Sequence, residues 1–240
     1  MATLLINYAD RGYFQAQKLN TRSGLLVGGL ERAVEFGRQH LEPAFVAKHR
    51  RVLDNPIGAG CWLWKPYVVL AALKGALNDG DVLFYADSGC HFIAPVAPVV
   101  DLCLKDRQKP ILLFSMPPTY LNRNFTKRDC FFYMGLDEPR YAEAVHTMAS
   151  FFVCQKTRFT LAFFEEWLRY AEDPRVLTPI PNECGLPDYP EFFQHRFDQS
   201  ILSLLGRKYD IPTVPDISQW GNDRRPSDIP QIIAHTRWKE

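Results

Sequence analysis

An apolar run that stops on polar residues constrains this fold more than any other part of the sequence. Val82 to Ala86 is almost wholly apolar, which is typical of a strand buried on both faces of a sheet. The preceding stretch from Pro66 to Leu77 spaces its apolar residues as a helix does, and Asn78-Asp79-Gly80 supplies a turn between the two. A helix that feeds a doubly buried strand predicts a parallel sheet with helical connections.

The same alternation continues along the chain. It predicts further strands at 4–6, 33–36, 110–114 and 151–154, and further helices at 15–27, 43–53, 96–104, 159–170 and 198–205. No internal repeat and no break in composition divides the sequence, so we expect one domain over residues 1–240. The fold class predicted is α/β, with a mostly parallel central sheet covered by helices on both faces.

Composition excludes several classes of partner. Basic and acidic residues nearly cancel, 28 against 27, so there is no broad positive field to hold nucleic acid or anionic lipid. We expect no nucleic-acid partner, no transmembrane segment and a soluble, cytoplasmic protein, because no apolar stretch has the form of a signal peptide or a membrane span. The six cysteines include no C-x-x-C pair, which indicates small buried residues rather than a zinc site or a disulfide framework.

Asp87-Ser88-Gly89 follows the buried strand directly. Ligands of open α/β sheets bind beyond the carboxyl ends of the strands, so these residues are candidates for a binding site. An ordinary turn, or a cap on a following helix, explains the same three residues equally well from the local pattern.

A wider set of residues resembles a known family. Tyr85 to Gly89, preceded by Trp62-Leu63-Trp64-Lys65-Pro66 and followed late by His195 to Gln199, is similar to the nucleotide-sugar glycosyltransferases of GT-A fold, distantly to their glycogenin and galactosyltransferase branch. The resemblance covers most of the chain and implies a Rossmann-like GT-A domain. It also implies a D-x-D motif whose acids hold Mn²⁺ or Mg²⁺ at the donor diphosphate. Gly89 stands in place of the second acid, so Asp87 alone matches.

The resemblance implies a role for individual residues as well. Asp198 would be catalytic, at the acceptor or the anomeric centre, and Asp87 and His235 would be metal ligands. The implied donor-binding residues are Tyr8, Asp10, Lys65, Asp87, Ser88, Arg128, Asp129 and Gln199. Each of several residues also has a purely structural explanation. These alternatives are Lys65 as a surface charge, Asp10 as a solvated loop residue, Asp198 as a helix cap, Arg128 and Asp129 as a surface ion pair, and His235 as part of a solvated tail.

These residues together predict a glycosyltransferase. Its partners would be a nucleoside-diphosphate sugar, most simply UDP-linked, and a hydroxyl of a glycan or glycoconjugate, as in polysaccharide biosynthesis. A catalytically inactive nucleotide-sugar or carbohydrate-binding relative is the alternative, favoured by the missing second acid. A nucleotidyltransferase is a more distant one, because residues 5–12 do not form the Gly-rich, basic phosphate loop that it would need.

Overall fold

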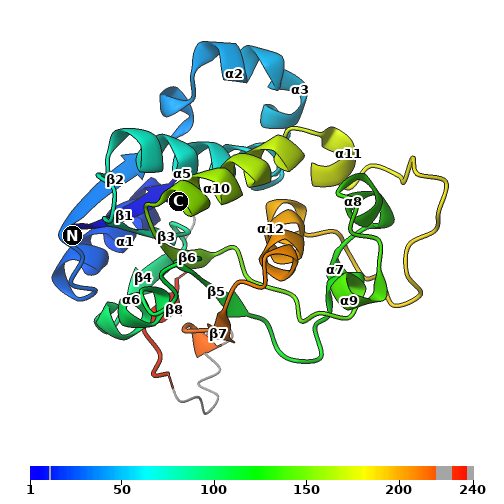
Figure 1. Ribbon diagram of the computed structural model, residues 1–240. Helices are drawn as coiled ribbons and strands as arrows, with labels where there is room; N and C mark the ends of the chain where they lie inside the picture. The colour runs from blue at the N-terminus through cyan, green and yellow to red at the C-terminus, as the bar shows by residue number, and fades with distance from the viewer. Residues whose placement is uncertain (11, 220–228, 237–240) are drawn as a thin grey trace.

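The computed structural model describes residues 1–10, 12–219 and 229–236. A six-stranded sheet in the order β2-β1-β3-β6-β5-β7 forms its centre (Figure 1). The strands are β1 Thr3–Tyr8, β2 Arg32–Phe36, β3 Val82–Ala86, β5 Ile111–Ser115, β6 Phe151–Gln155 and β7 Thr213–Pro215. β6 is antiparallel to both of its neighbours, while the other pairings are parallel. The predicted α/β class with a mostly parallel sheet is therefore confirmed.

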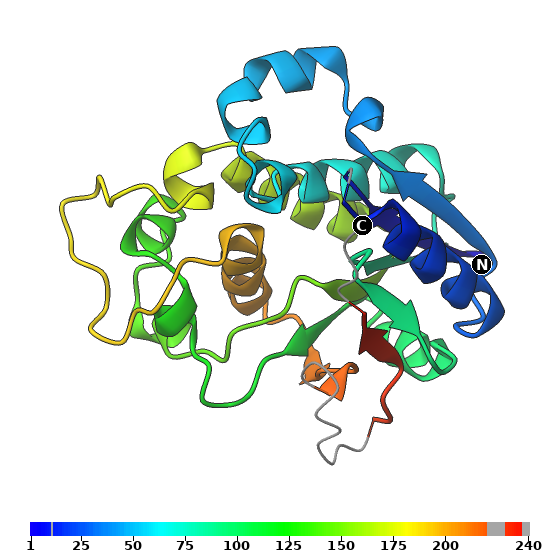
Figure 2. The same ribbon diagram turned by 180° about the vertical axis from the view of Figure 1, so that it is seen from behind.

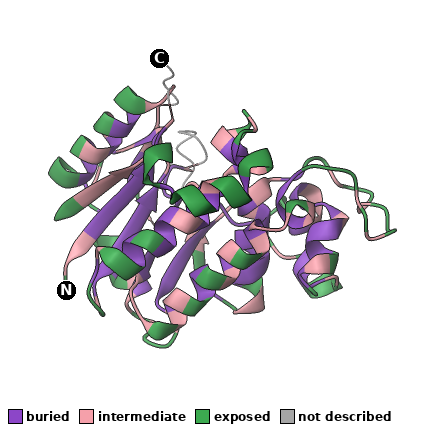
Figure 3. Ribbon diagram, turned by 90° about the horizontal axis from the view of Figure 1, so that it is seen from above, coloured by how far each residue is buried: buried purple, intermediate pink, exposed green. Residues whose placement is uncertain are grey.

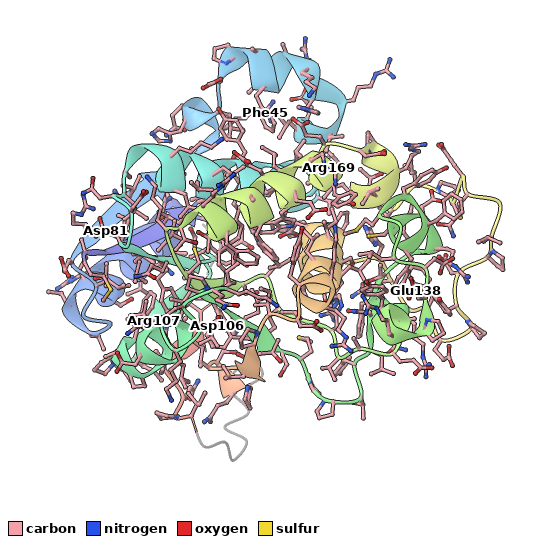
Figure 4. The ribbon with its side chains drawn as sticks, in the orientation of Figure 1. Phe45, Asp81, Asp106, Arg107, Glu138 and Arg169 are labelled. Atoms are coloured by element: carbon pink, nitrogen blue, oxygen red, sulfur yellow. The ribbon has the colours of Figure 1, made fainter. Side chains whose placement is uncertain are left out.

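Helices cover both faces of this sheet. The helices of the described chain are α1 Phe14–Leu26, α2 Pro43–Lys48, α3 Arg50–Leu53, α4 Gly58–Cys61, α5 Trp64–Gly75, α6 Ala97–Cys103, α7 Asn122–Phe125, α8 Arg128–Tyr133, α9 Pro139–Ala142, α10 Arg158–Ala171, α11 Pro174–Leu177 and α12 Phe197–Lys208, with a 3-10 turn at Arg38–His40. The predicted helix 43–53 is in fact two short helices that meet at His49. Phe45 of α2, labelled in Figure 4, packs on Tyr67 of α5.

β3 is buried on both faces, as its apolar run predicted. Leu83 and Tyr85 belong to a core shared with α5, α10 and α12, whereas Val82 and Phe84 belong to a second core shared with α6. Successive side chains of a strand point to opposite faces, so one apolar strand supplies both cores. Figure 3 shows the result as buried strands between helices whose outer faces are exposed.

A small second sheet brings the end of the described chain back to the middle. β4 Cys90–Phe92 pairs antiparallel with β8 Ile233–His235, with Cys90 opposite His235. Both strands are visible from behind in Figure 2. The sequence pattern did not predict either strand, because each has only three residues. Across the described ranges, no helix is long and apolar enough to cross a membrane.

Residues 58–62 have an unusual left-handed backbone. All five have positive φ, and Ala59, Cys61 and Trp62 are not glycine. Left-handed geometry costs an L-residue roughly 1–2 kcal/mol, so packing must hold this segment in place. Gly60, with φ of 107°, lies so close to α3 that a Cβ would come within 2.7 Å of the Leu53 Cα.

Gly60→Ala should therefore destabilise the protein by about 1–3 kcal/mol, through backbone strain and the collision with Leu53. Gly75→Ala is the matched control, because a Cβ on Gly75 at the end of α5 meets nothing within 4 Å. We expect Gly75→Ala to be neutral or slightly stabilising. Thermal and urea denaturation measure both, and equal stability of the two variants would contradict the strain.

Candidate active site

The carboxyl edge of the sheet borders a cleft of about 600 Å³. β1 and β3 are parallel neighbours, so their polar ends meet at this edge. The described residues that line the cleft are Tyr8, Ala9, Asp10, Gly12, Tyr13, Pro56, Gly58, Ala59, Trp62, Trp64, Asp87, Ser88, Gly89, Cys90, Ser150 and His235. Five residues singled out from the sequence lie together here: Tyr8, Asp10, Asp87, Ser88 and His235.

Polar contacts fix the backbone around Asp87. The Ser88 hydroxyl donates to the Tyr8 carbonyl at 2.6 Å and so ties the end of β3 to the end of β1. The Asn20 side-chain amide donates to the carbonyls of Asp87 and Cys90, at 3.2 and 2.9 Å. Asn20 in turn accepts a hydrogen bond from Asn7. Buried amides of this kind hold a turn rigidly only when their own bonds are satisfied, and these are.

A buried ammonium lies behind the cleft. The Lys65 Nζ lies 3.2 Å from Asp87 Oδ1, 3.1 Å from Asp198 Oδ2 and 3.1 Å from the Ala149 carbonyl. Three oxygen atoms thus surround the three N–H groups of the ammonium. The Lys65 side chain is 3% exposed and the Asp198 side chain 4%, whereas that of Asp87 is 30% exposed. Asp87 is therefore the member of this cluster that faces the cleft.

This arrangement bears on Lys65 and Asp198. Lys65 lies in the first turn of α5 and is not a surface charge, because its ammonium is buried among three oxygen atoms. Its role in donor binding stays a prediction. Asp198 lies in the first turn of α12, whose N-cap is Arg196, and its carboxylate pairs with Lys65. Asp198 is also absent from the described residues that line the cleft.

Burial tunes the ionisation of the cluster. It raises the pKa of Asp198 to about 6, against the opposing effect of Lys65. Burial also disfavours the charge on Lys65, but Asp198 and Asp87 hold the pKa of Lys65 above its ordinary value. Burial and the nearby Asp87 raise the pKa of Tyr85, whose hydroxyl donates to Asp87 Oδ1 at 2.5 Å. Asp198 is the group of this cluster that titrates near neutral pH.

Asp198 Oδ2 has the Lys65 ammonium at 3.1 Å, whereas the side-chain nitrogen of Gln199 has no hydrogen-bond partner in the described part of the chain. Buried polar atoms without partners are uncommon and call for an explanation. Gln199, next to Asp198, thus has unused bonding capacity at the start of α12. The Trp167 indole, which donates to the Asp198 carbonyl at 3.1 Å, fixes the backbone there.

Arg128 and Asp129 lie elsewhere. The Asp129 carboxylate accepts the backbone N–H groups of Glu183 and Cys184, at 2.8 to 3.0 Å. The Arg128 guanidinium bonds Asp137 at 3.0 Å and stacks on Tyr189. Neither residue lines the cleft that the described residues form. Their contacts hold the segment around 182–189 against α8, and donor binding by either residue stays a prediction.

His235 reaches the cleft because β8 pairs with β4. Its Nε2 lies 3.1 Å from the Ser218 hydroxyl and its Nδ1 lies 3.4 Å from the Cys90 thiol. The Thr236 N–H and hydroxyl both donate to the Gly89 carbonyl, at 2.9 and 3.1 Å. The prediction that His235 belongs to a solvated tail is therefore wrong. Arg237, Trp238 and Lys239, which shared in the resemblance, lie outside the described residues.

Sequence reasoning missed Ser150 and the stacking of Tyr8 on Trp64 at the floor of the cleft. Ser150 precedes β6, and only the antiparallel direction of β6 brings its start to the same edge as the end of β3. The Ser150 carbonyl accepts the Asp87 N–H at 2.7 Å. Tyr8 and Trp64 stack with their ring centroids 3.8 Å apart. The W-x-W-K-P pattern was a signal for Trp64, but nothing in the sequence shows that Tyr8 is its partner.

Comparisons with known proteins add little to this geometry. No protein-family model matches the sequence, and no curated protein matches it either. Among solved structures, the apo form of mouse xyloside xylosyltransferase 1 is similar with a TM-score of 0.49 and 9% sequence identity, over 98% of this chain and 97% of that chain. A similarity of this size decides neither fold nor function, so both rest on the contacts described above.

The raised pKa of Asp198 makes a prediction about stability. The folded state holds a proton on this carboxyl up to about pH 6, whereas the unfolded chain releases it near pH 3.9. Stability should therefore fall as the pH rises from about 4 to 6, and the loss should be complete above about pH 7. Asp198→Asn lacks this titration, so its melting temperature relative to wild type should increase across that range.

Asp79→Asn is the control for removing an acidic charge, because the Asp79 side chain is 90% exposed. Its melting temperature relative to wild type should stay level over the same range. A level difference for Asp198→Asn as well would show that Asp198 titrates alike in the folded and unfolded chain.

Proposed function

We propose that this protein is a GT-A-type glycosyltransferase that moves a sugar from a nucleoside diphosphate, most simply UDP, to a hydroxyl of a glycan or glycoconjugate. The observation that carries the proposal is that Tyr8, Asp10 and Asp87, from the ends of two parallel strands, line one cleft. Its volume of about 600 Å³ lies within the usual range for sites of small ligands and cofactors.

The charge of the cleft bears on the expected metal. Asp10 and Asp87 line it, and its described lining includes neither lysine nor arginine. Such a surface repels a bare diphosphate and fits a diphosphate that carries a divalent cation. No group of three His, Cys, Asp or Glu side chains suited to a metal occurs in the described ranges. The cation would therefore bind through Asp87, phosphate oxygens and water, as Mg²⁺ commonly does.

His235 suits this metal poorly, because both of its ring nitrogens already have partners. When bound, the cation would neutralise charge that develops on the departing diphosphate. The residues of the chain have separate tasks. The stacked Tyr8 and Trp64 give a flat floor for the base, Asp10 can accept hydrogen bonds from the base or ribose, and Lys65 positions Asp87.

Asp198 is the proposed general base. The acceptor oxygen forms the new bond to the anomeric carbon, the bond to the diphosphate oxygen breaks, and the acceptor proton passes to Asp198. Its pKa of about 6 is suited to this role near neutral pH. Because Asp198 is covered in this structure, acceptor access requires its contact with Lys65 to rearrange. In a retaining enzyme, Asp198 would instead orient the acceptor or stabilise the sugar cation.

An inactive nucleotide-sugar-binding protein is the second candidate. The burial of Asp198 and the glycine at position 89 favour it. Both candidates bind the donor, but only the enzyme releases UDP from it, either by transfer or by slow hydrolysis. UDP release from a panel of UDP-sugars therefore separates the two.

UDP should raise the melting temperature, and should do so more with Mn²⁺ than with EDTA. A ligand at a hundred times its dissociation constant stabilises the folded state by about 2.7 kcal/mol. Asp87→Asn keeps the size of the side chain and should remove most of the Mn²⁺-dependent part of the shift. Asp101→Asn, on the exposed side of α6, should keep it. A shift of equal size in Asp87→Asn and wild type would exclude Asp87 from the donor site.

Asp198→Asn should bind UDP normally and lose about 10²- to 10⁴-fold in turnover, because it cannot accept the acceptor proton. Wild-type turnover should fall as the pH drops below about 6, where Asp198 takes up a proton. The measurement is UDP release against pH in both proteins. Near-normal turnover by a stable Asp198→Asn variant would remove this residue from the mechanism.

A further inference from the structure

One half-buried arginine, Arg196, has no acidic partner among the residues that the structure describes. Four arginines of the described chain are intermediate in burial, and three of them face carboxylates. Arg128 lies 3.0 Å from Asp137, Arg175 lies 2.7 Å from Asp173, and Arg123 lies within 3.8 Å of Glu143 and Glu191. Arg196 takes part in no ion pair with any described residue. A guanidinium that has lost part of its water without gaining an anion is an unfavourable arrangement.

The surroundings of Arg196 are apolar and aromatic. Its guanidinium lies 4.0 Å from the centre of the Phe125 ring, and one of its nitrogens lies 3.9 Å from the Met116 sulfur. Tyr120 and Phe193 also contact Phe125 and are 39% and 75% exposed. Burial lowers the pKa of Arg196 from its ordinary value. The guanidinium is therefore packed against aromatic rings and remains partly exposed.

Arg196 lies on the same edge of the sheet as the candidate active site. β3 and β5 both pair antiparallel with β6, so their carboxyl ends point the same way. Neighbouring strands are about 4.8 Å apart, which puts the end of β5 about 10 Å from the end of β3. Met116 is the first residue after β5, just as Asp87 is the first residue after β3. Figure 1 shows α12, which Arg196 caps, beyond the β5 side of the sheet and away from β1.

We propose that Arg196 binds a carboxylate on the acceptor, so that the acceptor of this enzyme is a saccharide that contains a uronic acid. The inference rests on the proposed glycosyltransferase function. The cleft at β1 and β3 takes the nucleotide, so the acceptor must approach from the β5 side, where Arg196 lies two residues before Asp198. The end of β5, where Met116 contacts Arg196, lies about 10 Å from the end of β3, so a saccharide rather than a single small group would span the two.

The chemistry of the site favours a carboxylate over a phosphate. A planar guanidinium binds a carboxylate through two parallel hydrogen bonds, and a single positive charge balances one negative charge. A phosphate monoester carries nearly two negative charges and would need a second cation here, which the described contacts of Arg196 do not provide. The exposed rings of Tyr120 and Phe193 suit the apolar face of a pyranose beside that carboxylate.

Matched pairs of glycosides test this inference. The probes are the p-nitrophenyl β-glucuronide and β-galacturonide, each against the corresponding glucoside or galactoside, titrated by ligand-detected NMR at constant ionic strength with UDP present. Wild type should bind the uronides about tenfold more tightly or better, as charge-assisted hydrogen bonds allow. Arg196→Gln should reduce the ratio of uronide affinity to neutral-glycoside affinity to near one. Arg196→Lys should give an intermediate ratio, because lysine keeps the positive charge but cannot form two parallel hydrogen bonds to one carboxylate.

Arg196→Gln should fold, because its bonds to the Phe125 carbonyl and the Ser200 hydroxyl come from the backbone N–H. Arg123→Gln is the matched control, since Arg123 is a half-buried arginine that already has acidic partners. It should keep the wild-type preference. Equal affinity for uronide and neutral glycoside in wild type, or a preference that survives Arg196→Gln, would overturn the inference.

Two further results separate the possible failures. Stronger Arg196-dependent binding of p-nitrophenyl β-glucoside 6-phosphate than of the glucuronide would replace the carboxylate by a phosphate and overturn the uronic acid. UDP binding is measured in the same samples. If UDP binds but the uronide is not preferred, only the inference about the acceptor is wrong. If the uronide is preferred but neither UDP nor any UDP-sugar binds, the glycosyltransferase proposal is wrong, whereas the carboxylate site at Arg196 is retained.

Discussion

The ammonium of Lys65 joins three parts of the structure that are far apart in sequence. It lies on α5 and contacts Asp87 after β3, Asp198 on α12 and the Ala149 carbonyl before β6. A buried charge of this kind adds little net stability, but the loss of one partner leaves another charge uncompensated in the interior. The cluster therefore fixes where α5, β3 and α12 meet, and with them the inner wall of the cleft.

The direction of the strands divides the carboxyl edge of the sheet into two regions. β1 and β3 end at the cleft, with Tyr8, Asp10 and Asp87. β5 ends farther along, beside Arg196 and exposed aromatic rings. β6 runs between them in the opposite direction, so that Ser150 at its start lies between the two regions. Asp198 lies two residues after Arg196 in the chain, and Lys65 links it to Asp87. Asp198 is therefore the residue that connects the two regions.

A large part of the fold could be predicted from the sequence, because local patterns carry it. The apolar run of β3 required burial on both faces, and the helical spacing after Pro66 required α5. The resemblance also selected Tyr8, Asp10, Asp87, Ser88 and His235, which the structure brings to one cleft. Short elements such as β4 and β8 escaped prediction, since three residues carry too little periodicity to be distinguished from a loop.

The sequence alone determined the α/β class, the order of most elements and the polar ends of the strands, because each depends on neighbouring residues. The tertiary structure decided the environment of each polar side chain. It buried Lys65 and Asp198 together, left Asp87 facing the cleft and gave Arg128 and Asp129 contacts with a loop. It also packed Arg196 on an aromatic ring, with no acidic partner among the described residues. A side chain's ionisation and partners depend on residues distant in the chain, and a single sequence does not show which of them become neighbours.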